Sequence, residues 1–317
     1  MADTTLTQIT PGVNVFYVRK MLQAARPLLV HTRWAQVKDI PKKNTLAIRF
    51  RRYTLLSPAT TPLSEGITPS GSRLSITNIN ATVAQYGDYV TLTDLVVLTT
   101  LDPLLTENTS VLGQQTGNTL DQLCRDVITA GTTIQYSSTS TQTSEITAGM
   151  KLNSDEVKEA VRTLQGNDAH KMMTMINPST GFNTTPIAAA YIGIISHSTL
   201  FDLKNDTAWI PVQEYATQKG VMDGEVGAMD DVRFVMTTNA ATESSTVTVH
   251  KTLILAQNFY GISRISGAAI ENIVMPLGSG GSSDPLKQRA TQGWKATFVA
   301  KILNENFAVL IEHAVSS

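Results

Sequence analysis

The chain has 317 residues, of which 42% are hydrophobic and 16% charged, with a formal net charge of −1. This length allows one large or two ordinary domains with a substantial core, and the charged fraction is well below the usual quarter. The single cysteine, Cys124, excludes an internal disulfide, and the longest apolar run, around 187–195, is too short for a membrane helix. The first ten residues lack the pattern of a secretory signal, so we expect a cytosolic-type protein.

Charge is distributed unevenly along the chain. Residues 1–52 contain ten basic and two acidic side chains, a net charge of +8, which leaves −9 for the remainder. The ten basic residues are Arg19, Lys20, Arg26, Arg33, Lys38, Lys42, Lys43, Arg49, Arg51 and Arg52. A basic arm on an acidic body suits contact with nucleic acid, and it equally suits pairing between copies of one chain.

Two strand-like arms flank a long loop near the start of the chain. After a short basic amphipathic patch at 18–29, apolar and polar residues alternate over 46–52, as in a half-buried strand. The loop, YTLLSPATTPLSEGITPSGSRL (Tyr53–Leu74), contains three prolines and two glycines, and a second strand-like arm runs from residue 74 to 100. Long loops without secondary structure are uncommon in compact domains, and they usually serve a function or are disordered.

The strongest predicted helix spans residues 103–130. Asp102 is a suitable N-cap, Pro103 suits the first helical position, and Gly131 marks the end. Gly113 and Gly117 lie inside this helix at i,i+4 spacing, where each costs up to about 1 kcal/mol relative to alanine. Because the two glycines clear one face, we expect another backbone to cross the helix there.

A shorter helix is predicted after Asn153, because Asn153 and Glu156 have the spacing of a capping box, and Gly166 ends it. From residue 187 onward, apolar runs of strand length alternate with turn residues, which indicates a mixed α+β domain. Residues 278–283, GSGGSS, have the composition of a flexible connector. The last segment is interpreted as two strands joined at 304–306.

Signals for catalysis are weak. Known nucleophile, zinc, phosphate-loop and dinucleotide motifs are absent from the sequence. The best nucleophile candidate is the tetrapeptide SHST, in which His197 lies between Ser196 and Ser198. Residues adjacent in sequence do not form the usual triad, and the favoured interpretation is that Ser198 caps a following helix.

The sequence contains two further candidates for a chemical role, one as a metal site and one as a reactive thiol. Glu225, Asp230 and Asp231 could ligate a metal, but no histidine or calcium-loop spacing accompanies them, which favours solvated turn carboxylates. Cys124 could be a reactive thiol, but it lies in the apolar stripe of the long helix and is better interpreted as a small core residue. No cofactor or metal site is predicted.

The arginines before the loop have two possible roles. Arg49, Arg51 and Arg52 alternate with Phe50 and Tyr53, a combination of charge and aromatic rings that single-strand binders use. No helix-turn-helix or zinc module accompanies them, and the remainder of the chain is acidic. We favour a charged strand that docks onto an acidic neighbour, because this explains both the basic cluster and the adjoining loop.

The order of these elements resembles that in the major capsid proteins of tailed bacteriophages, which have the HK97-like fold. The amino-acid sequence is most similar to the phage N4-type capsid family. The resembling segments span nearly the whole chain: 25–43, 50–72, 86–96, 112–132, 224–240 and 292–303. The resemblance implies an N-arm (1–45), an E-loop hairpin with its return strand (46–101), a P-domain with its spine helix (102–150), an A-domain (151–285) and closing strands that return to the P-domain (286–317).

The resemblance also implies a function and partners. Such proteins form hexamers and pentamers that close an icosahedral head around packaged double-stranded DNA, in virions that assemble in the bacterial cytoplasm. A separate scaffolding protein, a portal, a possible decoration protein and non-specific DNA contact on the inner face are expected, with no membrane partner. The alternatives are a nucleic-acid-binding protein that uses the basic arm and, less favoured, a hydrolase that uses His197.

The residues expected to act in assembly fall into three groups. Subunit contacts through the E-loop and its base are assigned to Arg49, Arg51, Arg52, Tyr53, Leu56, Leu63 and Ile67. N-arm contacts are assigned to Arg19, Lys20, Arg26 and Arg33, and close packing on the spine helix is assigned to Gly113 and Gly117. A hairpin that lies on a neighbour can carry three prolines at its tip, because the neighbour supplies the core and the prolines limit strand pairing.

Overall fold

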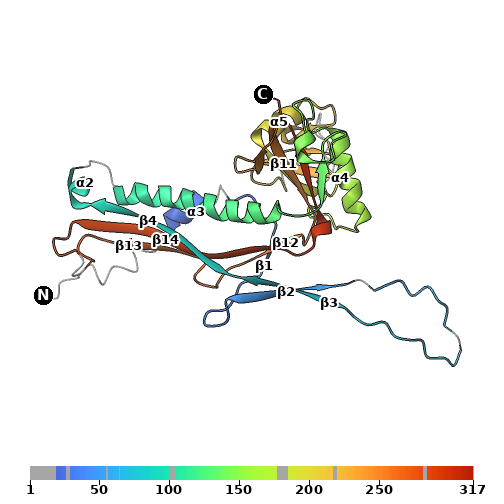
Figure 1. Cartoon of the computed structure of the whole chain (residues 1–317), viewed down its shortest axis with the longest axis horizontal. Coiled ribbons are helices and arrows are strands. Elements are labelled where there is room, and N and C mark those ends of the chain that lie inside the picture. Colours follow the sequence, from blue (N-terminus) through green and yellow to red (C-terminus); the bar gives the residue numbers. More distant parts are fainter. Residues whose placement is uncertain are drawn as a thin grey trace.

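The computed structural model describes residues 19–25, 29–54, 56–63, 65–99, 104–176, 185–216, 220–280 and 284–316. In this part of the chain an elongated unit, a compact unit and a projecting hairpin are arranged as Figure 1 shows. Among these residues, no helix is both long and apolar enough to cross a membrane.

The elongated unit is one helix lying along a five-stranded sheet (Figure 1). The long strand β14 is central, because β4 pairs with it along one edge while β12 and β13 share the other edge. The elements of this unit are β1 (Gln36–Val37), β4 (Ala84–Thr93), α2 (Asp94–Thr99), α3 (Leu104–Ile128), β12 (Tyr260–Ser263), β13 (Ile270–Met275) and β14 (Arg289–Ile302).

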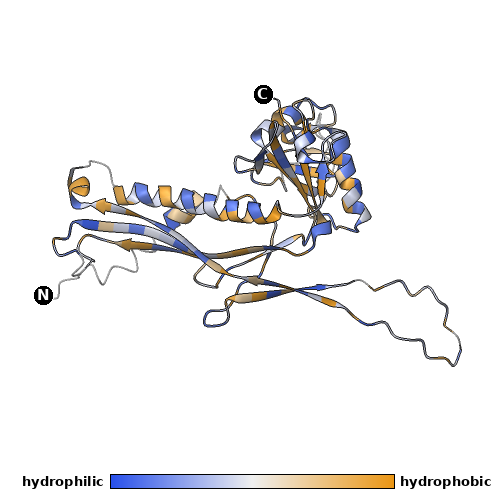
Figure 2. Cartoon of the chain, in the orientation of Figure 1, coloured by the Kyte–Doolittle hydropathy of each residue, from blue (hydrophilic) through white to orange (hydrophobic). Residues whose placement is uncertain are grey.

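The helix α3 is held to the sheet by one apolar stripe. Leu112, Leu120, Cys124 and Ile128 recur at helical spacing, are buried, and pack in one cluster with Trp294 of β14. Figure 2 shows polar and apolar residues alternating along this helix, as expected for an element with one covered face and one exposed face. The predicted helix at 103–130 is thus observed as Leu104–Ile128, while the proposed cap Asp102 and Pro103 lie outside the described residues.

The compact unit is an eight-stranded mixed sheet covered by α4 and α5. The α4 helix begins where predicted, since the Asn153 side chain accepts hydrogen bonds from the backbone N–H groups of Asp155 and Glu156. The elements of the compact unit are β5 (Ile134–Tyr136), α4 (Ser154–Gly166), β6 (Tyr191–Ser196), α5 (His197–Leu203), β7 (Ile210–Pro211), β8 (Glu225–Met229), β9 (Val232–Thr237), β10 (Thr242–Ser244), β11 (Thr248–Leu255) and β15 (Ala308–His313). Short 3-10 turns lie at Thr143–Glu145, Val212–Glu214 and Glu305–Phe307.

The hairpin consists of β2 (Ala47–Tyr53) and β3 (Ile76–Thr82), which pair antiparallel. As the alternation predicts, Ile48 and Phe50 are buried while Arg49 and Arg51 are exposed. The inner residues pack in a small cluster that anchors the hairpin to the elongated unit. Beyond the last pair, Tyr53 with Ile76, the loop extends away from both units (Figure 1).

Strand pairing corrects the expected division of the chain. Residues 151–285 were assigned to one domain, but β12 and β13 lie within that range and pair with β14 in the elongated sheet. The closing strands at 286–317 are expected to return to the P-domain with the long helix; β14 pairs in the sheet under that helix, whereas β15 pairs with β11 and β5 in the compact sheet. Each sheet therefore draws strands from distant parts of the chain, which local patterns cannot show.

The end of the second arm also differs from expectation. The Val-, Thr- and Tyr-rich run at 86–100 predicted a strand throughout, yet β4 ends at Thr93 and α2 begins at Asp94. The Asp94 N–H donates to the Gln288 carbonyl oxygen at 3.0 Å, where the pairing of β4 with β14 stops. The partner strand thus determines where β4 ends, and the remaining apolar residues form an exposed helix.

Candidate assembly surfaces

The hairpin loop makes almost no contact with its own subunit. Every described residue from 51 to 78 is exposed, including Leu63 (78%) and Ile67 (69%). Among the described residues of 56–74, the hydrogen bond present lies within the loop itself: the Thr60 N–H donates to the Pro58 carbonyl oxygen at 3.1 Å. Leu56, Leu63 and Ile67 are thus exposed apolar side chains on a segment without a core of its own, as expected for a surface that a partner covers.

The arginines at the hairpin base differ in their surroundings. The Arg49 side chain donates to Asn80 Oδ1 at 3.1 Å, and Arg52 donates to Asn304 Oδ1 at 3.0 Å. Arg51 and Tyr53 are exposed on the strand. The structure therefore ties two of these four residues to the subunit itself and leaves the other two on its surface.

The N-arm residues lie on the elongated unit. Residues 19–25 form a helix; Lys20 Nζ lies 3.6 Å from Glu107 of α3, and Arg19 is exposed. Arg33 donates from Nε to the Leu29 carbonyl oxygen at 2.8 Å and from a terminal nitrogen to that of Asp223 at 2.5 Å. Arg26, assigned to the same group, lies outside the described residues.

The 19–25 helix crosses α3 at the two glycines of the spine. A Cβ atom on Gly113 would lie 2.6 Å from the Met21 carbonyl oxygen, and one on Gly117 would lie 2.7 Å from that of Ala25. Both distances are to backbone, so a side chain there would push the N-terminal helix away. The missing side chains allow the two backbones to meet.

Replacing both glycines with alanine is expected to destabilise the protein, although alanine is the better helix former. The gain in helix propensity, up to about 1 kcal/mol per site, opposes an overpacking cost of typically about 1–3 kcal/mol. We expect a lower free energy of unfolding in urea for Gly113→Ala/Gly117→Ala. Gln114→Ala, on the exposed side of α3, is the control and should be nearly neutral. A double variant more stable than the wild type would contradict the close-packing interpretation.

A buried polar cluster, not anticipated from the sequence, fixes the chain that follows this helix. Asp121 is fully buried; its carboxylate accepts from the N–H groups of Val30 and His31 at 2.8 and 2.7 Å and from His31 Nδ1 at 2.7 Å. The Tyr260 hydroxyl donates to the His31 carbonyl oxygen. Asp121 shares a helix face with Gly117 and Cys124, so a carboxylate in a buried stripe was the available signal.

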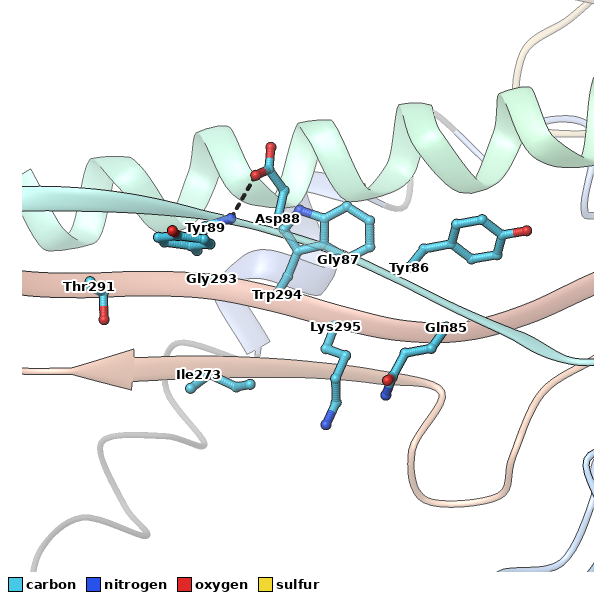
Figure 3. Close-up of a pocket in the computed structure, with 10 residues that line it drawn as sticks. All are labelled: Gln85, Tyr86, Gly87, Asp88, Tyr89, Ile273, Thr291, Gly293, Trp294 and Lys295. Atoms are coloured by element: carbon cyan, nitrogen blue, oxygen red, sulfur yellow. Dashed lines mark hydrogen bonds between the residues drawn. The ribbon is translucent and has the colours of Figure 1, made fainter.

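A shallow hollow of ≈520 Å³ lies on the elongated sheet between β4, β13 and β14. Figure 3 shows Ile273, Lys295 and Gln85 pointing away from α3, while the Asp88 carboxylate and the Trp294 indole lie on the helix side. Hydrogen bonds from Gln115 and from the Tyr89 N–H lower the pKa of Asp88, so this carboxylate is held in its charged form and is poorly suited to act as a general acid. The hollow offers a concave surface for packing.

The nucleophile candidate has a different arrangement from the one expected. Ser196, and not Ser198, caps α5, since its Oγ accepts from the Thr199 N–H at 3.1 Å. The Ser196 Oγ also lies 3.0 Å from Nδ1 of His250, whereas His197 is exposed at the start of the helix. Ser196 is buried, so a substrate has no access to its hydroxyl in this conformation.

The expectation of solvated carboxylates is wrong for Glu225. The Glu225 and Arg233 side chains are 0% and 1% exposed, and Arg233 donates to the two carboxylate oxygens at 2.7 and 2.6 Å. Tyr215 and the Met222 N–H supply further hydrogen bonds at 2.8 Å. The group is a closed ion pair, and no cluster of potential metal ligands occurs among the described residues.

The remaining two carboxylates and the cysteine lie in different surroundings. Asp230 is exposed as expected, and Asp231 pairs with Lys171 at 2.7 Å. Cys124 is fully buried, which confirms its interpretation as a core residue, and burial raises the pKa of its thiol well above the usual value.

Comparison with known proteins gives matches at the level of structure only. No known family profile matches the sequence, and no curated protein matches it. The fold is similar to the capsid of Ralstonia phage GP4, with a TM-score of 0.71 and 11% identity over 89% of this chain and 87% of that chain. It is also similar to the capsid asymmetric unit of cyanophage Pam1, with a TM-score of 0.63 and 13% identity over 93% and 92%.

A third similar structure is the capsid of cyanophage P-SCSP1u, with a TM-score of 0.62 and 12% identity over 90% of this chain and 87% of that chain. These matches cover nearly the full length of each chain. The mixed α+β chain thus has the HK97-like fold, as expected from its sequence.

Proposed function

We propose that this protein is the major capsid protein of a tailed phage and that it acts by self-assembly into a closed shell. The observation that carries the proposal is the hairpin loop, whose exposed apolar residues lie outside both cores of its own subunit. A second copy of the chain can cover these residues and so complete their burial. The full-length similarity of the fold to phage capsid structures supports this reading.

The finer assignments belong to the same proposal. We place the chain in the phage N4-type family and expect hexamers and pentamers that form an icosahedral head enclosing double-stranded DNA. A separate scaffolding protein, a portal and a decoration protein are the expected partners, and assembly takes place in the host cytoplasm. The hairpin and its base, with Arg51 and Tyr53 exposed, serve as contacts to the neighbouring copy.

The rival functions have less support. The hydrolase reading relied on His197 between two serines, but His197 is exposed, and Ser196 is buried and bonded to His250 instead. The nucleic-acid reading relied on the basic arm, but Arg49 and Arg52 already bond to asparagines of their own subunit. Direct binding to single strands would predict tight, steeply salt-dependent binding by the isolated subunit.

Electron microscopy of the purified protein tests the proposal. We expect closed, uniform particles from the protein alone or co-expressed with the scaffolding protein of its phage, because obligate interfaces of about 2,000–5,000 Å² or more form cooperatively. Sedimentation should show a sharp rise in particle mass above a threshold concentration. A monomer that remains monodisperse at high concentration, with or without the scaffolding protein, would refute the proposed function.

A further inference from the structure

Three of the five histidines gather at one end of the compact unit. His250 of β11 and His313 of β15 are opposite each other in the strand register, and their rings lie 6.3 Å apart in a stacked arrangement. His197, at the start of α5, directly follows Ser196, whose Oγ lies 3.0 Å from Nδ1 of His250. We call His197, His250 and His313 the histidine cluster.

The His313 ring has a hydrogen-bond partner at each nitrogen. Its Nδ1 lies 2.8 Å from the carbonyl oxygen of Ala314, which can only accept, so Nδ1 carries a proton. Its Nε2 lies 2.9 Å from the Thr252 hydroxyl, which donates to Nε2 when the ring is neutral. Since His313 is fully buried, protonation would place a cation between the sheet and α5.

The charged groups around the cluster offer little compensation. Asp202 of α5 faces the cluster, but its carboxylate already accepts from the Ser316 N–H at 2.8 Å and lies 3.8 Å from Lys151 Nζ. Thr242, the residue opposite His250 on β10, has no charge. Alternation along the strands places a second ion group on the other face of the sheet, where Lys251 pairs with Glu243 and Glu312. Additional positive charge in the cluster would therefore lack a free carboxylate.

The last described residues lie against this cluster. The Ala314 N–H donates to the Met150 carbonyl oxygen at 2.8 Å, and Lys151 Nζ donates to the Ser316 hydroxyl at 2.6 Å. Asp202 holds Ser316 through both the backbone N–H and the hydroxyl. The tail at 314–316 is thus attached directly beyond His313 by these polar contacts and by Ala314, which is buried in a small apolar cluster with Ile146 and Val249.

We propose that the histidine cluster is an acid-sensitive latch, which holds residues 314–316 on the compact unit at neutral pH and releases them on acidification. Protonation of His313 and His250 brings two cations together beside a carboxylate that is already paired. Fraying of the end of β15 relieves this repulsion, because it exposes His313 to water. The step needs no other subunit, so it is independent of the proposed function in assembly.

The direction of the pH dependence follows from burial. Burial lowers the pKa of His313 to about 4, below the usual value of about 6.5, and burial together with the His197 charge lowers the pKa of His250. A lowered folded-state pKa means that the closed state is fully stable above pH 6.5 and loses stability as the pH falls toward 4. For His313 alone, the opening equilibrium constant should rise about 30-fold between pH 8 and pH 5.

Hydrogen exchange of the full chain, read by mass spectrometry and corrected for intrinsic exchange rates, tests the latch. Between pH 8 and pH 5, amide protection at 313–316 should fall by at least about 30-fold, the part due to His313 alone, while protection in α3 stays unchanged. His313→Gln keeps a hydrogen-bonding side chain without a charge, so it should abolish most of this pH dependence. The matched control is His170→Gln, an exposed histidine outside the cluster, which should behave as wild type.

A second variant and a second measurement cover the case in which His313→Gln does not fold. His250 is only partly buried, and His250→Gln removes one of the two like charges, so protection at pH 5 should be partly restored. The histidine ring signals of the wild type, followed by NMR, should place the titration of His313 well below pH 6. Equal protection at both pH values in the wild type, or unchanged loss of protection in His250→Gln, would overturn the proposal.

Discussion

Deletion of residues 56–71 is expected to leave a folded, soluble subunit that no longer forms closed shells. The strands β2 and β3 keep their pairing from Ala47–Thr82 to Tyr53–Ile76, because the deleted residues lie outside this register. The subunit core loses nothing, since the described residues of this segment are exposed. The assembled shell would lose the surface that Leu56, Leu63 and Ile67 bury on the neighbouring copy.

The size of this effect can be estimated from side-chain burial. Moving one leucine or isoleucine from water to an apolar contact is worth about 1.5–3 kcal/mol. Three such contacts per subunit, even at a fraction of that value, amount to a change of at least about 100-fold in the threshold concentration for assembly. The triple substitution Leu56→Ser/Leu63→Ser/Ile67→Ser should therefore reproduce the deletion without shortening the loop.

Both variants should be compared with wild type under conditions in which wild type forms particles, by electron microscopy and sedimentation. Thr60→Ser/Thr61→Ser is a matched control, because it changes exposed polar residues of the same loop. Circular dichroism should show unchanged secondary structure in all of them. Normal shells from the deletion would exclude the hairpin as an assembly contact.

Arg233→Met is expected to destabilise the compact unit severely. The substitution leaves the Glu225 carboxylate buried and removes the two hydrogen bonds that Arg233 donates to it, at 2.7 and 2.6 Å. Breaking a buried pair in this way costs about 3–5 kcal/mol, a large share of the roughly 5–15 kcal/mol that stabilises a typical domain. The midpoint of urea unfolding should fall accordingly, and much of the protein should be insoluble on expression.

Two variants separate charge burial from loss of packing. Arg162→Met removes a surface pair with Glu159, in which both side chains are more than half exposed, so it should change the free energy of unfolding by less than about 1 kcal/mol. The double variant Arg233→Met/Glu225→Leu removes both charges and should recover part of the lost stability. If Arg233→Met unfolds at the same urea concentration as Arg162→Met, the ion pair has no structural role.

Local patterns in the sequence were sufficient for several elements of the fold. Alternation at 46–52 predicts the inner face of β2, Asn153 predicts the start of α4, and the glycines at 113 and 117 indicate a backbone crossing on α3. Each of these depends on residues within one or two turns of each other. The signal for each is therefore local, because it comes from backbone sterics and side-chain spacing within one element.

Other features depend on residues that lie far apart in sequence. Ser196 meets His250, Asp121 meets His31, and Glu225 becomes buried only because Arg233 lies beside it on the next strand. Glu225 and Arg233 look like ordinary surface residues in the sequence, since their burial depends on which strands pair. The same reason explains the error at residue 285: β12 and β13 carry no local mark of the sheet they join.

The range of the interactions explains which features the sequence predicts and which ones only the tertiary structure decides. Short-range steric and hydrogen-bonding preferences make the hairpin loop, the long helix and the cap at Asn153 predictable from the amino-acid sequence alone. The pairing of β14 with strands from both halves of the chain follows from long-range burial of apolar surface. In the other sheet, the pairing of β8 with β9 brings Glu225 beside Arg233. That burial can be satisfied by several strand orders, and only the folded chain selects one.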